Sequence, residues 1–253
     1  MTKHALVVLS GGQDSTTCLF WAKAQGYDLH AVTFDYCQRH AAEIDAAKKI
    51  AELADVTSHE IIRLGPILKG TSPLVSDYHD LEQYEDYTVL PGGLEKTFVP
   101  MRNQLFLTIA SNRAFVLACD VLITGVCEED YGGYPDCRRS FIDAIEEAGN
   151  LGTFTPDSGR QPLEILTPLM YLTKAATVRM AYGLPGCWEA LAYTHTAYDG
   201  NYPPTGKDHA NLLREKGFAE AGLPDPLVLR AYREGLMSLP KTENYRDAHE
   251  YLG

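Results

Sequence analysis

The chain has 253 residues, of which 45% are hydrophobic and 22% are charged, as expected of a globular protein with a sizeable core. Its 34 acidic residues outnumber its 22 basic residues and give a formal net charge of −12, which favours a small-molecule substrate over a nucleic acid. No apolar stretch reaches the length of a membrane span, and the run at residues 5–9 is too short for a secretory signal. We therefore expect a cytoplasmic protein without a membrane partner.

Apolar, β-branched runs alternate with helical patterns along most of the chain. The runs predict strands at residues 5–9, 29–34, 58–64, 121–124 and 164–166. Apolar spacing predicts helices at residues 16–25, 41–54 and 102–118, the last of them mostly apolar and buried. This alternation predicts an α/β fold, in which a parallel twisted sheet carries helices on both faces and ligands bind beyond the carboxyl ends of its strands.

Two stretches depart from this alternation. Residues 65–96 are rich in Gly, Pro, Asp and Tyr, which predicts an excursion or lid. Periodicity weakens after residue 184, and the prolines at 203 and 204 are incompatible with regular structure, although one more helix is expected at 227–237. We therefore divide the chain into a nucleotide-binding domain at residues 1–185 and a helical or irregular C-terminal region at 186–253.

The six cysteines are scattered, and none forms a CxxC pair. In a mid-sized chain without an export signal, reduced thiols are the default. A disulfide framework is therefore not expected.

The loop after the first predicted strand reads Ser10-Gly11-Gly12-Gln13-Asp14-Ser15. Two glycines let the backbone approach a ligand closely, and the following helix N-terminus favours a phosphate. The loop lacks the lysine of a Walker A sequence. A Gly-Gly turn with Asp14 or Ser15 as a helix cap would look similar, so a phosphate site and a structural turn both stay open.

The SGGxDS pattern after an N-terminal strand resembles the PP-loop of the N-type ATP pyrophosphatases. Enzymes of that kind release pyrophosphate from ATP and leave an adenylate on a substrate oxygen. The resemblance implies that ATP is bound with Mg²⁺ bridging its phosphates. It assigns nucleotide binding to Ser10, Gly11, Gly12, Asp14, Ser15 and Phe34.

Four further segments extend the resemblance: FDYCQRH at 34–40, TFVPMRN at 97–103, TGVCEED at 124–130 with GYPDCR at 133–138, and TPLM at 167–170 before Lys174. In order and spacing they resemble the 7-cyano-7-deazaguanine synthase family, QueC, over about residues 5–220. The resemblance implies a homodimeric, ATP-dependent ligase that converts 7-carboxy-7-deazaguanine and ammonia to the nitrile. The route it implies runs through an adenylate, an amide and a second activation.

The residues of these segments suit such roles. The catalytic candidates neutralise phosphate or carboxylate charge, with surface ion pairs as the alternative reading: Arg39, Arg102 and Lys174. The substrate-binding candidates are His40, Asn103, Tyr134, Asp136 and Arg138. Asp136 suits the paired donors of a guanine-like edge or a Pro-Asp turn, Tyr134 suits stacking or core packing, and His40 suits an anion or a structural role.

The family's four-cysteine zinc site near the C-terminus has no counterpart here. Its positions hold Ala197, Thr205, Asp208 and Asn211, and no cysteine follows Cys187. A structural zinc needs about four N, S or carboxylate ligands. We therefore assign no residue to a metal and expect Tyr198, Tyr202 and two prolines to hold this segment by packing inward.

Two smaller departures lie near the presumed substrate. Met101 replaces the family's usual glycine, and Ala176 stands where a glutamate is usual. Met101 and the missing cysteines motivate an alternative in which the reaction stops at 7-amido-7-deazaguanine. Two further alternatives are a tRNA-thiolating PP-loop enzyme and a nucleotide-binding protein without catalysis. The acidic balance and the absence of a CxxC pair argue against the former, which Cys137 keeps open, and the intact SGGQDS and GYPDCR segments argue against the latter.

Overall fold

The computed structural model describes residues 2–37, 42–68, 70, 72, 74–75, 82–89, 96–128, 134–153, 161–197 and 200–252. Five parallel strands form one sheet in the order β3-β2-β1-β4-β5. They are β1 (His4–Val8), β2 (Asp28–Asp35), β3 (Ser58–Arg63), β4 (Val121–Ile123) and β5 (Glu164–Leu166). All five predicted strands are confirmed. The chain builds outward from β1 to β3 and then returns to the other side of β1, so the strand order reverses between β1 and β4.

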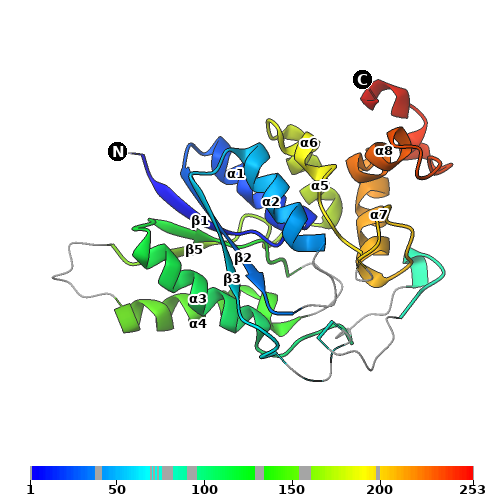
Figure 1. Cartoon of the computed structure of the whole chain (residues 1–253). Coiled ribbons are helices and arrows are strands. Elements are labelled where there is room, and N and C mark those ends of the chain that lie inside the picture. The colour runs from blue at the N-terminus through cyan, green and yellow to red at the C-terminus, as the bar shows by residue number, and fades with distance from the viewer. Residues whose placement is uncertain are drawn as a thin grey trace.

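Helices cover both faces of the sheet, as predicted (Figure 1). One face carries α1 (Gln13–Ala24), α2 (Ala42–Ala54), α5 (Lys174–Gly183) and α6 (Cys187–Leu191), and the other carries α3 (Arg102–Val116) and α4 (Arg139–Thr153). Side chains along a strand alternate between the faces. Ala5 and Val7 of β1 therefore join one apolar cluster, and Leu6 joins the other.

The prediction of a helix at residues 102–118 is confirmed, but the prediction that this helix is buried is wrong. The helix is present, but its buried residues are only Leu107, Ala110 and Ala114. Phe115 and Val116 are 44% and 57% exposed. The helix lies on an outer face of the sheet, so only one stripe of it meets the core.

The region after residue 186 is more regular than predicted. It contains α7 (His209–Ala221) and α8 (Pro226–Arg233), followed by 3₁₀ turns at Glu243–Tyr245 and Ala248–Tyr251. α7 packs along α5, and Phe218 joins the same apolar cluster as α1 and α2. The 3₁₀ turn at Tyr87–Val89, within the predicted excursion, also contacts α7. In the part of the chain that the structure describes, no helix has the length and apolarity needed to cross a membrane.

Polar contacts hold the described part of the segment at residues 194–214. Asp208 caps α7, because its Oδ1 accepts from the backbone N–H of Asn211 at 2.9 Å and its Oδ2 accepts from Asn211 Nδ2 at 3.0 Å. Both side chains are buried. Asp208 is the one strong zinc ligand among the four family positions and is used as a cap, so these residues do not fit a structural zinc.

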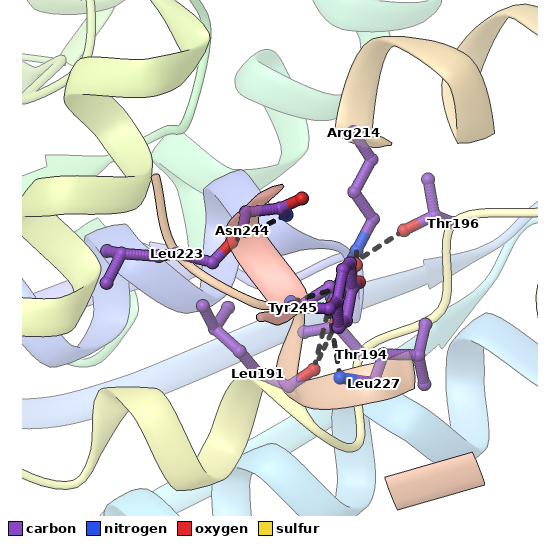
Figure 2. Close-up of polar contacts among 9 residues, drawn as sticks. Leu191, Thr194, Thr196, Arg214, Leu223, Leu227, Asn244 and Tyr245 are labelled. Atoms are coloured by element: carbon purple, nitrogen blue, oxygen red, sulfur yellow. Dashed lines mark hydrogen bonds and ion pairs between the residues drawn. The ribbon is translucent and has the colours of Figure 1, made fainter. Parts of the chain in front are cut away.

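Arg214, which is only 3% exposed, is the centre of this network (Figure 2). Its guanidinium binds Asp225 through two bonds, Nε to Oδ2 at 2.6 Å and Nη2 to Oδ1 at 2.8 Å. Nη1 donates to the hydroxyls of Thr194 and Thr196 at 2.8 and 2.9 Å. Asp225 also caps α8 by accepting from the Leu227 N–H at 2.9 Å. One buried ion pair therefore joins α7, α8 and the segment after α6.

The prediction that tyrosines and prolines hold this segment is borne out in part by Tyr202, which ties the segment to α8 without being fully buried. Tyr202 is half-buried, its hydroxyl donates to Glu234 Oε2 at 2.7 Å, and its ring lies against the guanidinium of Arg230. Pro203 and Pro204 are likewise only half-buried. Tyr198 lies outside the described residues.

Candidate active site

A cavity of about 400 Å³ opens at the carboxyl ends of β1, β2 and β4, at the point where the strand order reverses. Loops after the three strands form its floor, and α3, α5 and α7 supply further walls. The predicted site residues that line it are Ser10, Gly12, Asp14, Ser15, Phe34, Arg102, Asn103, Tyr134 and Lys174. The volume suits a small-molecule ligand.

The loop between β1 and α1 is braced by its own hydroxyl groups. Ser10 Oγ and Ser15 Oγ lie 3.0 Å apart, and Ser15 Oγ donates to the carbonyl oxygen of Gly12 at 3.2 Å. Thr16 Oγ1 donates to the same oxygen at 2.8 Å. Gly12 is the N-cap residue of α1. The positive end of the helix dipole and two serine hydroxyls therefore face the cavity from one rigid turn.

Gly11 lies behind this turn and does not line the cavity. Its φ of +86° favours glycine, and a Cβ there would lie 2.3 Å from the carbonyl oxygen of Glu43 and 2.9 Å from the backbone nitrogen of Ala47. Its own carbonyl accepts from the His195 N–H at 2.9 Å. This placement gives Gly11 a packing role against α2, whereas the resemblance implied contact with phosphate.

Lys174 and Asp14 form an ion pair inside the cavity. Lys174 Nζ lies 2.6 Å from Asp14 Oδ2, and the two side chains are 14% and 26% exposed. α7 crosses close to Lys174, because a Cβ at Gly217 would lie 3.0 Å from the Lys174 Cβ. Burial and the charge of Lys174 lower the pKa of His209, another cavity residue, so the imidazole stays neutral beside the ammonium.

Arg102, at the N-terminus of α3, faces a second group of ionisable side chains. Burial raises the pKa of Glu43 to about 7, although the positive charge of Arg102 opposes the shift. Burial also raises the pKa values of Tyr36 and Asp136, and Arg102 opposes both shifts. Arg102 therefore offers positive charge at one end of the cavity, next to a carboxyl group that exchanges its proton near neutral pH.

Aromatic rings form an apolar wall on the same side. Phe34 and Phe106 stack with centroids 4.4 Å apart and planes 10° from parallel. Tyr134 lies beside Phe98, and its hydroxyl is 2.7 Å from Thr97 Oγ1. Such a wall suits a flat heteroaromatic ring.

Some predicted residues lie elsewhere. Asp136 is buried near Arg102, and its carbonyl accepts from Asn103 Nδ2 at 3.3 Å, but it does not line the cavity. Arg138 is exposed and also lies outside the lining. Arg39 and His40 fall outside the described residues.

The sequence reasoning missed several cavity residues: Tyr36, Glu43, Phe106, Gly125, His195, His209 and Arg214. Gly125 is required because a Cβ there would lie 3.0 Å from the backbone of Asp14. Tyr36 and Gly125 follow the ends of β2 and β4, and this position could have marked them as cavity residues. No local signal marked the residues of α7, which reach the cavity only through the fold.

The sheet order and the position of the cavity define the class of protein: a doubly wound α/β protein with its ligand site at the switch point. The family model described as "Queuosine biosynthesis protein QueC" matches residues 4–222. The chain belongs to the QueC family.

Curated relatives agree with this assignment. A Gloeobacter violaceus protein named 7-cyano-7-deazaguanine synthase is 50% identical over 227 residues, which cover 89% of this chain and 95% of that protein. A protein of the same name from Chromobacterium violaceum is 48% identical and covers 92% of this chain and 96% of its own length. A third, from Laribacter hongkongensis, is 45% identical with coverages of 90% and 95%.

Proposed function

We propose that this chain is an ATP-dependent carbon–nitrogen ligase that converts 7-carboxy-7-deazaguanine and ammonia to 7-cyano-7-deazaguanine. The family assignment and the name shared by the three relatives support this activity. The observation that carries it is the cavity itself, which a serine-braced helix N-terminus and the Lys174–Asp14 pair line together with Arg102 and an aromatic wall. The helix N-terminus and Lys174 suit a polyphosphate, and Arg102 with the aromatic rings suits a planar acid.

In this proposal the phosphates of ATP lie against the N-terminus of α1. Ser10, Ser15 and the turn at Gly12 donate to phosphate oxygens, and Lys174 neutralises their charge. The Asp14 carboxylate suits Mg²⁺, which takes one or two carboxylates together with substrate oxygens and would neutralise charge on the phosphates. Binding would thus exchange the Lys174–Asp14 contact for contacts to the nucleotide.

The reaction needs two activations of the same carbon. A carboxylate oxygen of the acid attacks the α-phosphorus of ATP, pyrophosphate leaves, and ammonia then displaces AMP to form the amide. A second ATP adenylates the amide oxygen, and loss of AMP with the amide protons leaves the nitrile. In this proposal Arg102 holds the carboxylate, and Glu43, which also lines the cavity and has a pKa raised to about 7, accepts a proton released by the attacking nitrogen.

A product assay tests this function. The purified protein is incubated with the acid, ATP and ammonium, and both the base and the nucleotide products are identified by mass spectrometry. We expect the nitrile as the final base, with AMP and pyrophosphate formed together. Production of ADP and phosphate, or accumulation of the amide as the final product, would overturn the proposal. Met101 gives no reason to expect the amide, because its side chain is 59% exposed and lies outside the cavity lining.

A lysine variant tests the site. Lys174→Met removes the ammonium group at the phosphate end and should lower AMP formation at least about 100-fold, as loss of one charge-stabilising donor does in other enzymes. Lys48→Met, on the exposed surface of α2, is the matched control and should leave AMP formation unchanged. Equal rates for the two variants would remove Lys174 from the mechanism.

A further inference from the structure

We infer that His4, Asp28 and His30 form a binding site for a divalent transition-metal ion, with Zn²⁺ as the best match, at the amino-terminal edge of the sheet. Each of the three offers one ligand atom, and these atoms all lie within 4.8 Å of one another. The inference does not depend on the proposed function. It concerns the edge of the sheet opposite the cavity.

The pairing of β1 with β2 creates the cluster. His4 lies opposite Asp28 in the register, and His30 lies two residues further along β2, on the same face as Asp28. His4 Nδ1 is 3.2 Å from Asp28 Oδ2, and the two imidazole rings stack with centroids 5.8 Å apart. The three ligands therefore come from adjacent strands of a rigid sheet, which fixes their spacing before any ion binds.

The Nδ1 atom of His4 is buried without a hydrogen bond to any described residue although the rest of its side chain is partly exposed, and its contact with Asp28 Oδ2 at 3.2 Å is an ion-pair distance. Buried polar atoms are normally hydrogen-bonded, so such an atom needs an explanation. A metal ion between the imidazole and the carboxylate would supply it.

Neighbouring residues orient the ligands in the way that metal sites require. Ser58 Oγ lies 2.7 Å from His30 Nδ1 and fixes the ring. Thr57 donates to Asp28 Oδ1, which leaves Oδ2 toward His4. Asp120 anchors the backbone N–H of His4 at 2.7 Å. Such outer contacts set ligand orientation and tune metal affinity.

The ligand set also selects the kind of cation. Two imidazoles with one carboxylate match Zn²⁺ and its first-row neighbours, whereas Mg²⁺ and Ca²⁺ prefer sites made of oxygen.

Metal titration of the full chain tests the inference. The protein is stripped with a chelator and titrated with ZnCl₂ by calorimetry, and the zinc-loaded protein is examined by X-ray absorption. We expect one site per chain whose absorption spectrum shows imidazole and oxygen scattering without sulfur. His4→Asn and Asp28→Asn should each weaken binding more than tenfold. Ser58→Ala, which leaves the ligands intact, should weaken it about tenfold.

His249→Asn is the matched control, since His249 is exposed near the C-terminus, and its affinity for zinc should equal that of the unaltered chain. Zinc should raise the melting temperature of the unaltered chain and not that of Asp28→Asn. Sulfur scattering would place the ion on cysteines and overturn the inference. So would the absence of zinc binding, or equal affinities in Asp28→Asn and His249→Asn once circular dichroism shows that both are folded.

Discussion

Replacing Arg214 with methionine tests how the C-terminal helices are held. The substitution keeps an apolar stem of similar length and removes the guanidinium, which makes two bonds to Asp225 and two to threonine hydroxyls. Asp225 is only 4% exposed, so its carboxylate would stay buried without its cation. Removing one partner of a buried ion pair costs about 3–5 kcal/mol, so we expect Arg214→Met to lower the free energy of unfolding by about that amount.

The assay is urea unfolding followed by tryptophan fluorescence, because Trp188 packs against Phe218 of α7. Arg246→Met is the matched control, since Arg246 makes an exposed ion pair with Glu243 and its loss should cost less than about 1 kcal/mol. The double variant Arg214→Met/Asp225→Asn removes both charges. It should cost less than the sum of the single variants by about 1 kcal/mol or more. Additive costs, or equal costs for Arg214→Met and Arg246→Met, would refute the reasoning.

Three further predictions concern the cavity and its rim. The pKa of Glu43 is raised from 4.5 to about 7 on folding, so the stability that its protonated form contributes is present below pH 4.5 and lost as the pH rises through 7. The free energy of unfolding of Glu43→Gln, compared with that of the unaltered chain, should therefore rise by about 3 kcal/mol between pH 4.5 and pH 7. Urea unfolding at both pH values measures this difference, and a difference that does not change with pH would contradict the prediction. Gly11→Ala should lower the unfolding free energy by more than about 2 kcal/mol because its Cβ meets backbone atoms, whereas Gly12→Ala, whose Cβ meets nothing closer than 3.5 Å, should stay within about 1 kcal/mol; similar thermal melts for the two would show the loop to be adaptable. Met101 has a left-handed φ of 66°, so Met101→Gly should raise the free energy of unfolding by about 0.5–1 kcal/mol, seen as a higher urea midpoint. The KM for the acid should stay unchanged.

The sheet was predictable because its strands are short runs of apolar, β-branched residues between glycines and polar turns. The loop at Ser10–Ser15 was equally visible as a turn between a strand and a helix, and its resemblance to a PP-loop, not its composition alone, pointed to a phosphate site. The helix α4 was missed although Phe141, Ile142 and Ile145 repeat at helical spacing. That signal was present in the sequence.

The helix α7 was hidden for a physical reason. Its buried residues mix polar His209, Asn211 and Arg214 with apolar Leu212, Leu213 and Phe218, so the sequence shows no clean apolar stripe. Arg214 is tolerated there because after folding it bonds to Thr194 and pairs with Asp225, which lie 20 and 11 residues away along the chain. The same long-range contacts bring α7 to the cavity, which is why His209 and Arg214 could not be assigned to it beforehand.

At Met101 the sequence analysis found the departure from the family pattern but predicted the wrong consequence. The residue was expected to add bulk near the substrate, yet its side chain points to solvent. The backbone, with its left-handed φ, accounts for a preference for glycine at this position.

The buried guanidinium of Arg214 holds the C-terminal helices without a metal and without thiol chemistry, unlike a site in which cysteine thiolates bind zinc. Cysteines must lose protons to bind a metal and release it to chelators or after oxidation. Arginine keeps its charge at every pH that proteins meet and undergoes none of those reactions. We therefore expect the contacts that join α7, α8 and the segment after α6 to persist through metal starvation or oxidative stress, together with the wall that α7 contributes to the cavity.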